Sequence, residues 1–99
     1  MDIQKVLENL GIEEKEAKVY LALLSLGEAT ATKLAEKTNL DRTLMYQLTN
    51  KLIERGLVSY IIKNNVRYFS AADPETLLKN MQEKEQELQK LLPELKARQ

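Results

Sequence analysis

The chain has 99 residues, which suits one domain, and contains neither cysteine nor histidine, which excludes disulfides, thiol nucleophiles, imidazole bases and the usual zinc sites. No apolar run approaches the roughly 20 residues that span a bilayer, and the first residues lack a signal-peptide core, so we expect a cytoplasmic protein without metal or cofactor. The net charge is zero, but residues 30–70 carry seven basic and only three acidic side chains, a local excess of positive charge that suits phosphate contact.

Two helices are predicted in the first 26 residues. Asp2 can cap a short helix that ends near Leu10, with Gly11 in the left-handed position that follows it. A second helix is expected over residues 13–26, because apolar residues recur there at the i, i+3, i+4, i+7 spacing of one helical face. Further apolar residues widen this face, so we expect the second helix to be central and mostly buried.

A helix-turn-helix is predicted next. Thr30 is the expected N-cap of a third helix over residues 31–38. After a tight connection at Asn39-Leu40, Asp41 caps a fourth helix that runs to Arg55. In a helix-turn-helix the second helix is the recognition helix, which lies in the major groove of DNA.

A β-hairpin is predicted directly after the fourth helix. Residues 57–62 are rich in β-branched and aromatic side chains, and residues 66–70 form the return strand. Asn64-Asn65 can adopt the positive φ angles of a two-residue hairpin turn. A helix-turn-helix followed by a hairpin is a winged helix, so the predicted fold is mainly α with a small β-hairpin and a long C-terminal helix.

The long C-terminal helix is predicted to start at Asp73-Pro74-Glu75 and to run at least to Leu92, where Pro93 should kink or end it. Apolar residues form a heptad seam along it, interrupted by Lys84 at one d position. The seam can fold back on the apolar face of the first helix or pair with a second copy. Because the helix outruns a domain formed by residues 1–72, we expect residues 73–99 to form a homodimer. The seam consists of Leu77, Met81, Leu88, Leu91 and Leu95.

The outward face of the fourth helix carries side chains that can read DNA. Arginine can fork onto guanine, and glutamine or asparagine onto adenine, while hydroxyl groups can meet phosphate or base. The predicted contacts on this helix are Arg42, Thr43, Tyr46 and Gln47, followed by Asn50 and Lys51 as phosphate contacts or solvated side chains. Leu44 has two open interpretations, contact with a thymine methyl group or packing on the hairpin.

The hairpin and the third helix add further predicted contacts. Basic and amide side chains gather near the tip of the hairpin, where they can meet the minor groove or the backbone. The N-terminus of the third helix can receive a phosphate through its N–H groups, although Thr30 can equally serve as a cap alone. These contacts are Lys63, Asn64, Asn65 and Arg67 on the hairpin, and Thr30, Thr32 and Lys33 on the helix.

Several stretches resemble TrmB-like transcriptional regulators over residues 10–80. They are Leu10-Gly11-Ile12, residues 16–24, Gly27, Leu34-Ala35, Arg42-Thr43 with Tyr46, residues 52–58, and Tyr68 followed by Asp73-Pro74-Glu75 with Leu77-Leu78. The resemblance implies an archaeal or bacterial DNA-binding regulator with its recognition helix at residues 42–55 and with dimerisation through the helix after the wing. Longer members carry an effector domain, often for sugars, after that helix. This chain stops at Gln99, so we expect no small-molecule effector. Glu13, Asp41 and Leu44 depart from the family's usual small cap, proline and polar residue.

The alternatives to DNA binding are an enzyme and a protein-interaction module. An enzyme is not expected, because cysteine, histidine and a phosphate-binding glycine loop are absent and the acidic residues are expected on solvated helix faces. A winged-helix protein-interaction module is the alternative, and the zero net charge suits it. The basic segment at residues 30–70 favours a sequence-specific transcriptional regulator, with the wing at residues 58–70 on the backbone or minor groove. A homodimer would bind two half-sites about 34–36 Å apart.

Overall fold

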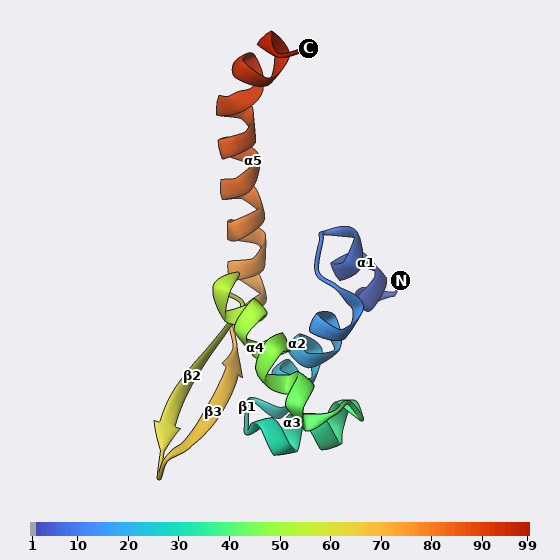
Figure 1. Cartoon of the computed structure of the whole chain (residues 1–99), viewed down its shortest axis with the longest axis vertical. Helices are drawn as coiled ribbons and strands as arrows, with labels where there is room; N and C mark the ends of the chain where they lie inside the picture. Colours follow the sequence, from blue (N-terminus) through green and yellow to red (C-terminus); the bar gives the residue numbers. More distant parts are fainter. Residues whose placement is uncertain (1) are drawn as a thin grey trace.

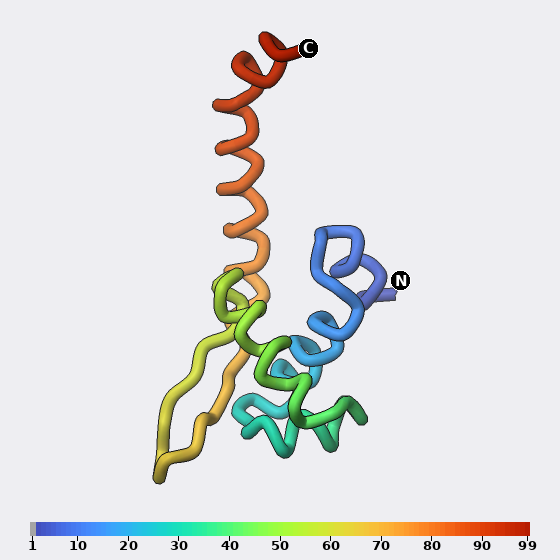
Figure 2. Tube along the Cα trace, viewed as in Figure 1, coloured from blue at the N-terminus to red at the C-terminus, as the bar shows by residue number. Residues whose placement is uncertain are grey.

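The computed structural model describes residues 2–99, and shows a cluster of short helices and a small sheet from which one long helix projects (Figures 1 and 2). The elements in chain order are α1 (Ile3–Asn9), α2 (Glu14–Leu26), β1 (Glu28–Ala29), α3 (Ala31–Thr38), α4 (Arg42–Glu54), β2 (Val58–Lys63), β3 (Val66–Ala71) and α5 (Pro74–Ala97). Within residues 2–99, no helix combines the length and apolarity needed to cross a membrane.

Side-chain caps fix where most of the helices begin. The carboxylates of Asp2, Asp41 and Asp73 and the hydroxyl oxygen of Thr30 each accept a hydrogen bond from a backbone N–H in the first turn. These are the caps that the sequence predicts. α2 starts after Glu13, whose side chain makes no capping hydrogen bond.

Helix α4 ends in a Schellman motif. Gly56 has a φ of +75°, its N–H donates to the carbonyl of Ile53, and the N–H of Leu57 donates to the carbonyl of Leu52, both at 2.9 Å. The predicted stop at Gly56 is therefore confirmed. The Schellman motif at Gly56 turns the chain directly into the hairpin, so the hairpin lies beside α4.

The hairpin is part of a three-stranded antiparallel sheet in the order β1-β3-β2. Asn64 and Asn65 form its turn with φ angles of 51° and 63°, which fits a type I′ turn. Strand β1 pairs with β3 through Glu28 opposite Ser70 and Ala29 opposite Phe69. The sequence pattern did not reveal β1, because two residues are too few to show an alternation.

The core is almost entirely aliphatic and lies between α2, α3, α4 and the sheet. Tyr20 and Phe69 are its buried aromatic residues, exposed by only 2% and 1%. α2 supplies six buried residues, which confirms that this helix is central. Leu34 and Leu52 are fully buried from α3 and α4, so the helix-turn-helix is held rigidly by one core.

Helix α5 projects away from this core, and Figure 1 shows it well separated from α1. Leu77 packs against the core, whereas Leu88 and Leu95 are about half exposed. The fold-back of the seam onto α1 is therefore not adopted. α5 continues through Pro93 to Ala97 rather than ending there, and its last turns lean away from the axis of the preceding ones. The proline can be tolerated because this part is exposed, so water can satisfy the carbonyl that loses its partner.

Candidate nucleic-acid interface

A groove of about 460 Å³ lies where the starts of α3 and α4 face the hairpin. Its floor includes Phe69, which is buried. Segments far apart in the sequence meet here, because the core holds α3 and α4 together and β3 passes beside both. Six of the predicted DNA-contacting residues line the groove, namely Thr30, Thr32, Arg42, Tyr46, Asn65 and Arg67.

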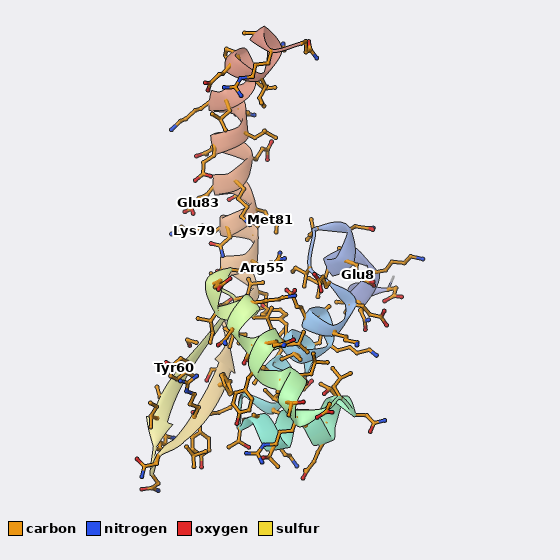
Figure 3. All side chains as sticks on the ribbon, viewed as in Figure 1. Glu8, Arg55, Tyr60, Lys79, Met81 and Glu83 are labelled. Carbon is orange, nitrogen blue, oxygen red and sulfur yellow. The ribbon has the colours of Figure 1, made fainter. Side chains whose placement is uncertain are left out.

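Arg67 is held on the groove side of the hairpin by an aromatic side chain. Its guanidinium carbon lies 4.6 Å from the ring centre of Tyr60, a cation–π contact. The Tyr60 ring lies in turn 6.0 Å from that of Phe69, and Figure 3 shows Tyr60 on the hairpin. This contact restricts the Arg67 side chain, which would reduce the side-chain freedom lost on binding an anion.

Lys63 lies on the opposite face of the hairpin. It pairs with Val66, the neighbour of Arg67, and successive residues of a strand point to opposite faces. Its ammonium group lies 3.0 Å from the carboxylate of Glu28 and 5.3 Å from the ring centre of Tyr68. The structure therefore separates Lys63 from the groove that contains Arg67.

The exposed face of α4 divides into a centre and two flanks. With 3.6 residues per turn, Thr43, Gln47 and Asn50 lie opposite the buried side of the helix, and all three are exposed. Arg42 and Tyr46 occupy the flank toward the hairpin, where they line the groove. The centre of the helix thus offers a hydroxyl and two amides, and the flank adds an arginine and a tyrosine.

Leu44 and Lys51 lie on the other flank of α4. The ammonium group of Lys51 is 3.8 Å from the carboxylate of Glu13, at the start of α2. Leu44 is half-buried and packs against the core. The helical repeat turns Leu44 away from the groove flank, so the groove does not support its packing on the hairpin, and both interpretations of Leu44 stay predictions.

The acidic residue at the start of α4 is already engaged. The Asp41 carboxylate accepts hydrogen bonds from the backbone N–H of Thr43 at 3.1 Å and from its hydroxyl group at 3.0 Å. Asp41 therefore acts as a cap for α4, which accounts for a carboxylate beside a basic groove. The Thr43 hydroxyl oxygen can still accept a hydrogen bond.

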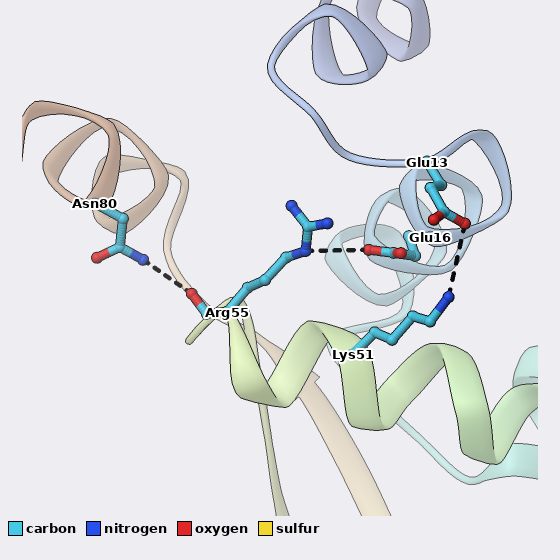
Figure 4. Close-up of polar contacts among 5 residues, drawn as sticks. All are labelled: Glu13, Glu16, Lys51, Arg55 and Asn80. Atoms are coloured by element: carbon cyan, nitrogen blue, oxygen red, sulfur yellow. Dashed lines mark hydrogen bonds and ion pairs between the residues drawn. The ribbon is translucent and has the colours of Figure 1, made fainter. Parts of the chain in front are cut away.

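One acidic residue contradicts the expectation of solvated acids. Glu16 of α2 is fully buried, and the Nε atom of Arg55 lies 3.4 Å from its carboxylate (Figure 4). The carbonyl of Arg55 accepts a hydrogen bond from the Asn80 side chain of α5 at 3.3 Å. Sequence reasoning missed this cluster, because the partners are far apart in the chain. Among the described carboxylates, no group of three or more is placed to hold a metal ion.

A tyrosine hydroxyl ties α2 to the start of α5. The Tyr20 hydroxyl donates to the carbonyl of Ala72 at 3.0 Å. Burial raises the pKa of Tyr20 above its ordinary value of 10.0, and the negative charge of Asp73 raises it further. The hydroxyl therefore stays protonated and acts as a donor at neutral pH.

Comparisons with known proteins point to one family. The model of the family described as "Sugar-specific transcriptional regulator TrmB" matches residues 7–75. Over 82 residues, the chain is 28% identical to the HTH-type sugar sensing transcriptional regulator TrmBL1 of Pyrococcus furiosus and 32% identical to the uncharacterized protein YrhO of Bacillus subtilis. Both matches cover 83% of this chain but only 24% and 30% of the relatives, so the chain spans less than a third of either.

The fold has a solved counterpart in TrmBL2, described as an archaeal chromatin protein with a novel mode of DNA binding. The two structures agree with a TM-score of 0.84 over 97% of this chain and 38% of that one, at 21% sequence identity. At this identity the likeness shows the fold alone. It confirms the predicted winged helix with a long C-terminal helix.

Proposed function

The chain belongs to the TrmB family of transcriptional regulators, and from this premise we propose that it binds DNA sequence-specifically, as a homodimer, to regulate transcription. The observation that carries the proposal is the groove in which Arg42 and Tyr46 of α4 face Arg67 of the hairpin. Two guanidinium groups and the N-terminus of α3 converge there. This is the chemistry that binds a backbone phosphate.

In the proposed complex, α4 lies in the major groove, which is about 12 Å wide and admits one helix. Thr43 and Gln47 then face the base edges, and Arg42, in the first turn of α4, can fork onto a guanine. The hairpin follows the adjacent backbone or minor groove, with Asn65 and Arg67 nearest the duplex. Residues 1–72 are proposed as the DNA-binding domain.

The proposed dimer forms through residues 73–99. Leu77 is already packed against the core, so pairing depends on the distal seam, where Leu88, Leu91 and Leu95 are each about half exposed. Lys79 and Glu83 point to the side of α5 opposite Met81 (Figure 3), so the seam side is apolar except for Lys84 and the opposite side is charged. A paired seam would remove an apolar strip from water, a strip that monomeric proteins seldom expose.

An electrophoretic mobility shift tests the proposal directly. We expect the chain to retard a random duplex at about 50 mM salt and to lose affinity steeply toward 200 mM, because neutralised phosphates release counterions. A duplex selected from random sequence should bind more tightly than the starting pool. No retardation at about 50 mM salt would contradict DNA binding and would support a protein-docking module instead.

A further inference from the structure

The C-terminal end of the recognition helix is clamped between two other helices (Figure 4). On one side, the Arg55 side chain lies 3.4 Å from the Glu16 carboxylate of α2. On the other side, the Arg55 carbonyl accepts a hydrogen bond from the Asn80 side chain of α5. One residue therefore joins α4 both to the centre of the domain and to the projecting helix.

Both contacts have a physical reason to persist. Glu16 is fully buried, and neither of its carboxylate oxygens has a hydrogen-bond partner within residues 2–99, so the Arg55 charge compensates an otherwise costly buried anion. The last carbonyl groups of a helix have no partner inside the helix. Asn80 supplies a donor to one of them, and its amide nitrogen lies close over Gly56.

A second bridge reinforces the same junction. The Leu57 carbonyl, just after α4, accepts a hydrogen bond from the Ala72 N–H at 2.7 Å. The Ala72 carbonyl in turn accepts the Tyr20 hydroxyl of α2. The base of α5 is thus fixed through the backbone at Ala72 and through a side chain at Asn80, about two turns further on.

We propose that Arg55 and Asn80 are positioning residues that set the angle between the recognition helix and α5, and so the separation of the two recognition helices in the dimer. The proposal rests on the proposed function, because it needs the dimer. α5 has 24 residues, which makes it about 36 Å long at 1.5 Å per residue. A tilt of about 10° at its base would move its far end by about 6 Å, a large error against half-sites about 34–36 Å apart.

The test measures the distance between the two recognition helices in the full chain without DNA. The chain has no cysteine, so Asn50→Cys gives one exposed attachment site per protomer for a nitroxide spin label. Double electron–electron resonance then reports the distance between the two labels. Asn80→Ala is the test variant, and Gln82→Ala, an exposed α5 position two residues on, is the matched control.

We expect a single narrow distance distribution for the labelled parent and for Gln82→Ala. Asn80→Ala should increase the width of the distance distribution at least about twofold, because a small change of angle at the base of α5 produces a large displacement at its far end. Glu16→Gln, which keeps the shape but removes the charge, should also widen it and tests the Arg55 side chain separately. Far-UV circular dichroism checks that each variant is folded.

The same Asn80, Gln82 and Glu16 substitutions, made in the unlabelled chain that keeps Asn50, have a functional readout. On duplexes with two selected half-sites at varied separation, Asn80→Ala should lose the parent's preference for one separation and keep its affinity for a single half-site. Distributions and spacing profiles that match those of Gln82→Ala would overturn the inference and leave the proposed function intact. A parent chain with no dipolar signal would overturn the dimer, and the inference with it.

Discussion

The ammonium group of Lys63 lies 3.0 Å from the carboxylate of Glu28, on the face of the hairpin away from Arg67. The two basic residues of the wing are therefore not equivalent. Lys63 is paired with an acid of β1, whereas Arg67 lines the groove together with Arg42. The positive charge of the wing that is placed to contact DNA is therefore that of Arg67, on the groove side.

Arg67→Ala should weaken binding to a random duplex more than Lys63→Ala. Loss of one phosphate contact should lower the slope of log K against log salt by about 1. Lys63→Ala should change the slope less, because the Lys63 ammonium group is already paired with Glu28 outside the groove and so neutralises no phosphate there. Fluorescence anisotropy over a salt series measures both slopes, and equal losses would contradict the separation of the two faces.

Arg42→Ala should reduce sequence preference more than Lys63→Ala does. The side chain starts from the first turn of α4, where recognition helices reach base edges. The expected loss on the selected duplex is about 1–3 kcal/mol, with a smaller loss on random sequence. A uniform loss on all sequences would show instead that Arg42 touches only phosphate.

The parts of the fold that local chemistry determines could be predicted from the sequence. Thr30 and Asp41 act as caps because a side chain and a backbone N–H only two or three residues apart form the bond. Gly56 ends α4, and Asn64-Asn65 turn the hairpin, because each adopts a positive φ that most residues avoid. These features depend on neighbours within a few residues.

The parts that depend on distant partners could not be predicted. Glu16 looks like a surface residue until Arg55, which follows 39 positions later, is brought beside it. β1 exists only because Ala29 pairs with Phe69. Twelve of the thirteen candidate contacts lie at exposed positions and Thr30 is half-buried, but their grouping, with Arg67 in the groove and Lys63 outside it, follows from strand register.

Tyr20→Phe should lower stability and change its pH dependence. At pH 7 the lost hydrogen bond to Ala72 should cost about 1 kcal/mol. The folded-state pKa of Tyr20 is raised above 10.0, so its contribution is complete below pH 10 and is lost as the pH rises through the folded pKa. Urea unfolding from pH 8 to 11 should show a shallower decline for Tyr20→Phe than for the parent. Tyr60→Phe, the control, should show the same steeper decline of stability as the parent. Identical curves for Tyr20→Phe, Tyr60→Phe and the parent would contradict the assignment.

Leu88→Asp should prevent dimerisation and leave each chain folded. The Leu88 side chain is 54% exposed in the single chain, so an aspartate there is solvated in the monomer, but pairing would bury an uncompensated charge. Sedimentation velocity should show a monomer at a concentration where the parent is a dimer. Gln89→Asp, one position off the seam, is the control. A Leu88→Asp dimer as stable as the parent would exclude the distal seam as the interface.

The most direct test of the central claim is a map of the DNA-binding surface by NMR. Titration of the isotopically labelled chain with the selected duplex should shift the amide signals of Thr32, Arg42, Tyr46, Gln47 and Arg67 first. Signals from the exposed side of α1 and from Lys63 should move less. Shifts concentrated on the groove between α3, α4 and the hairpin would support the account, whereas shifts concentrated on α1 or on the Lys63 face of the hairpin would contradict it.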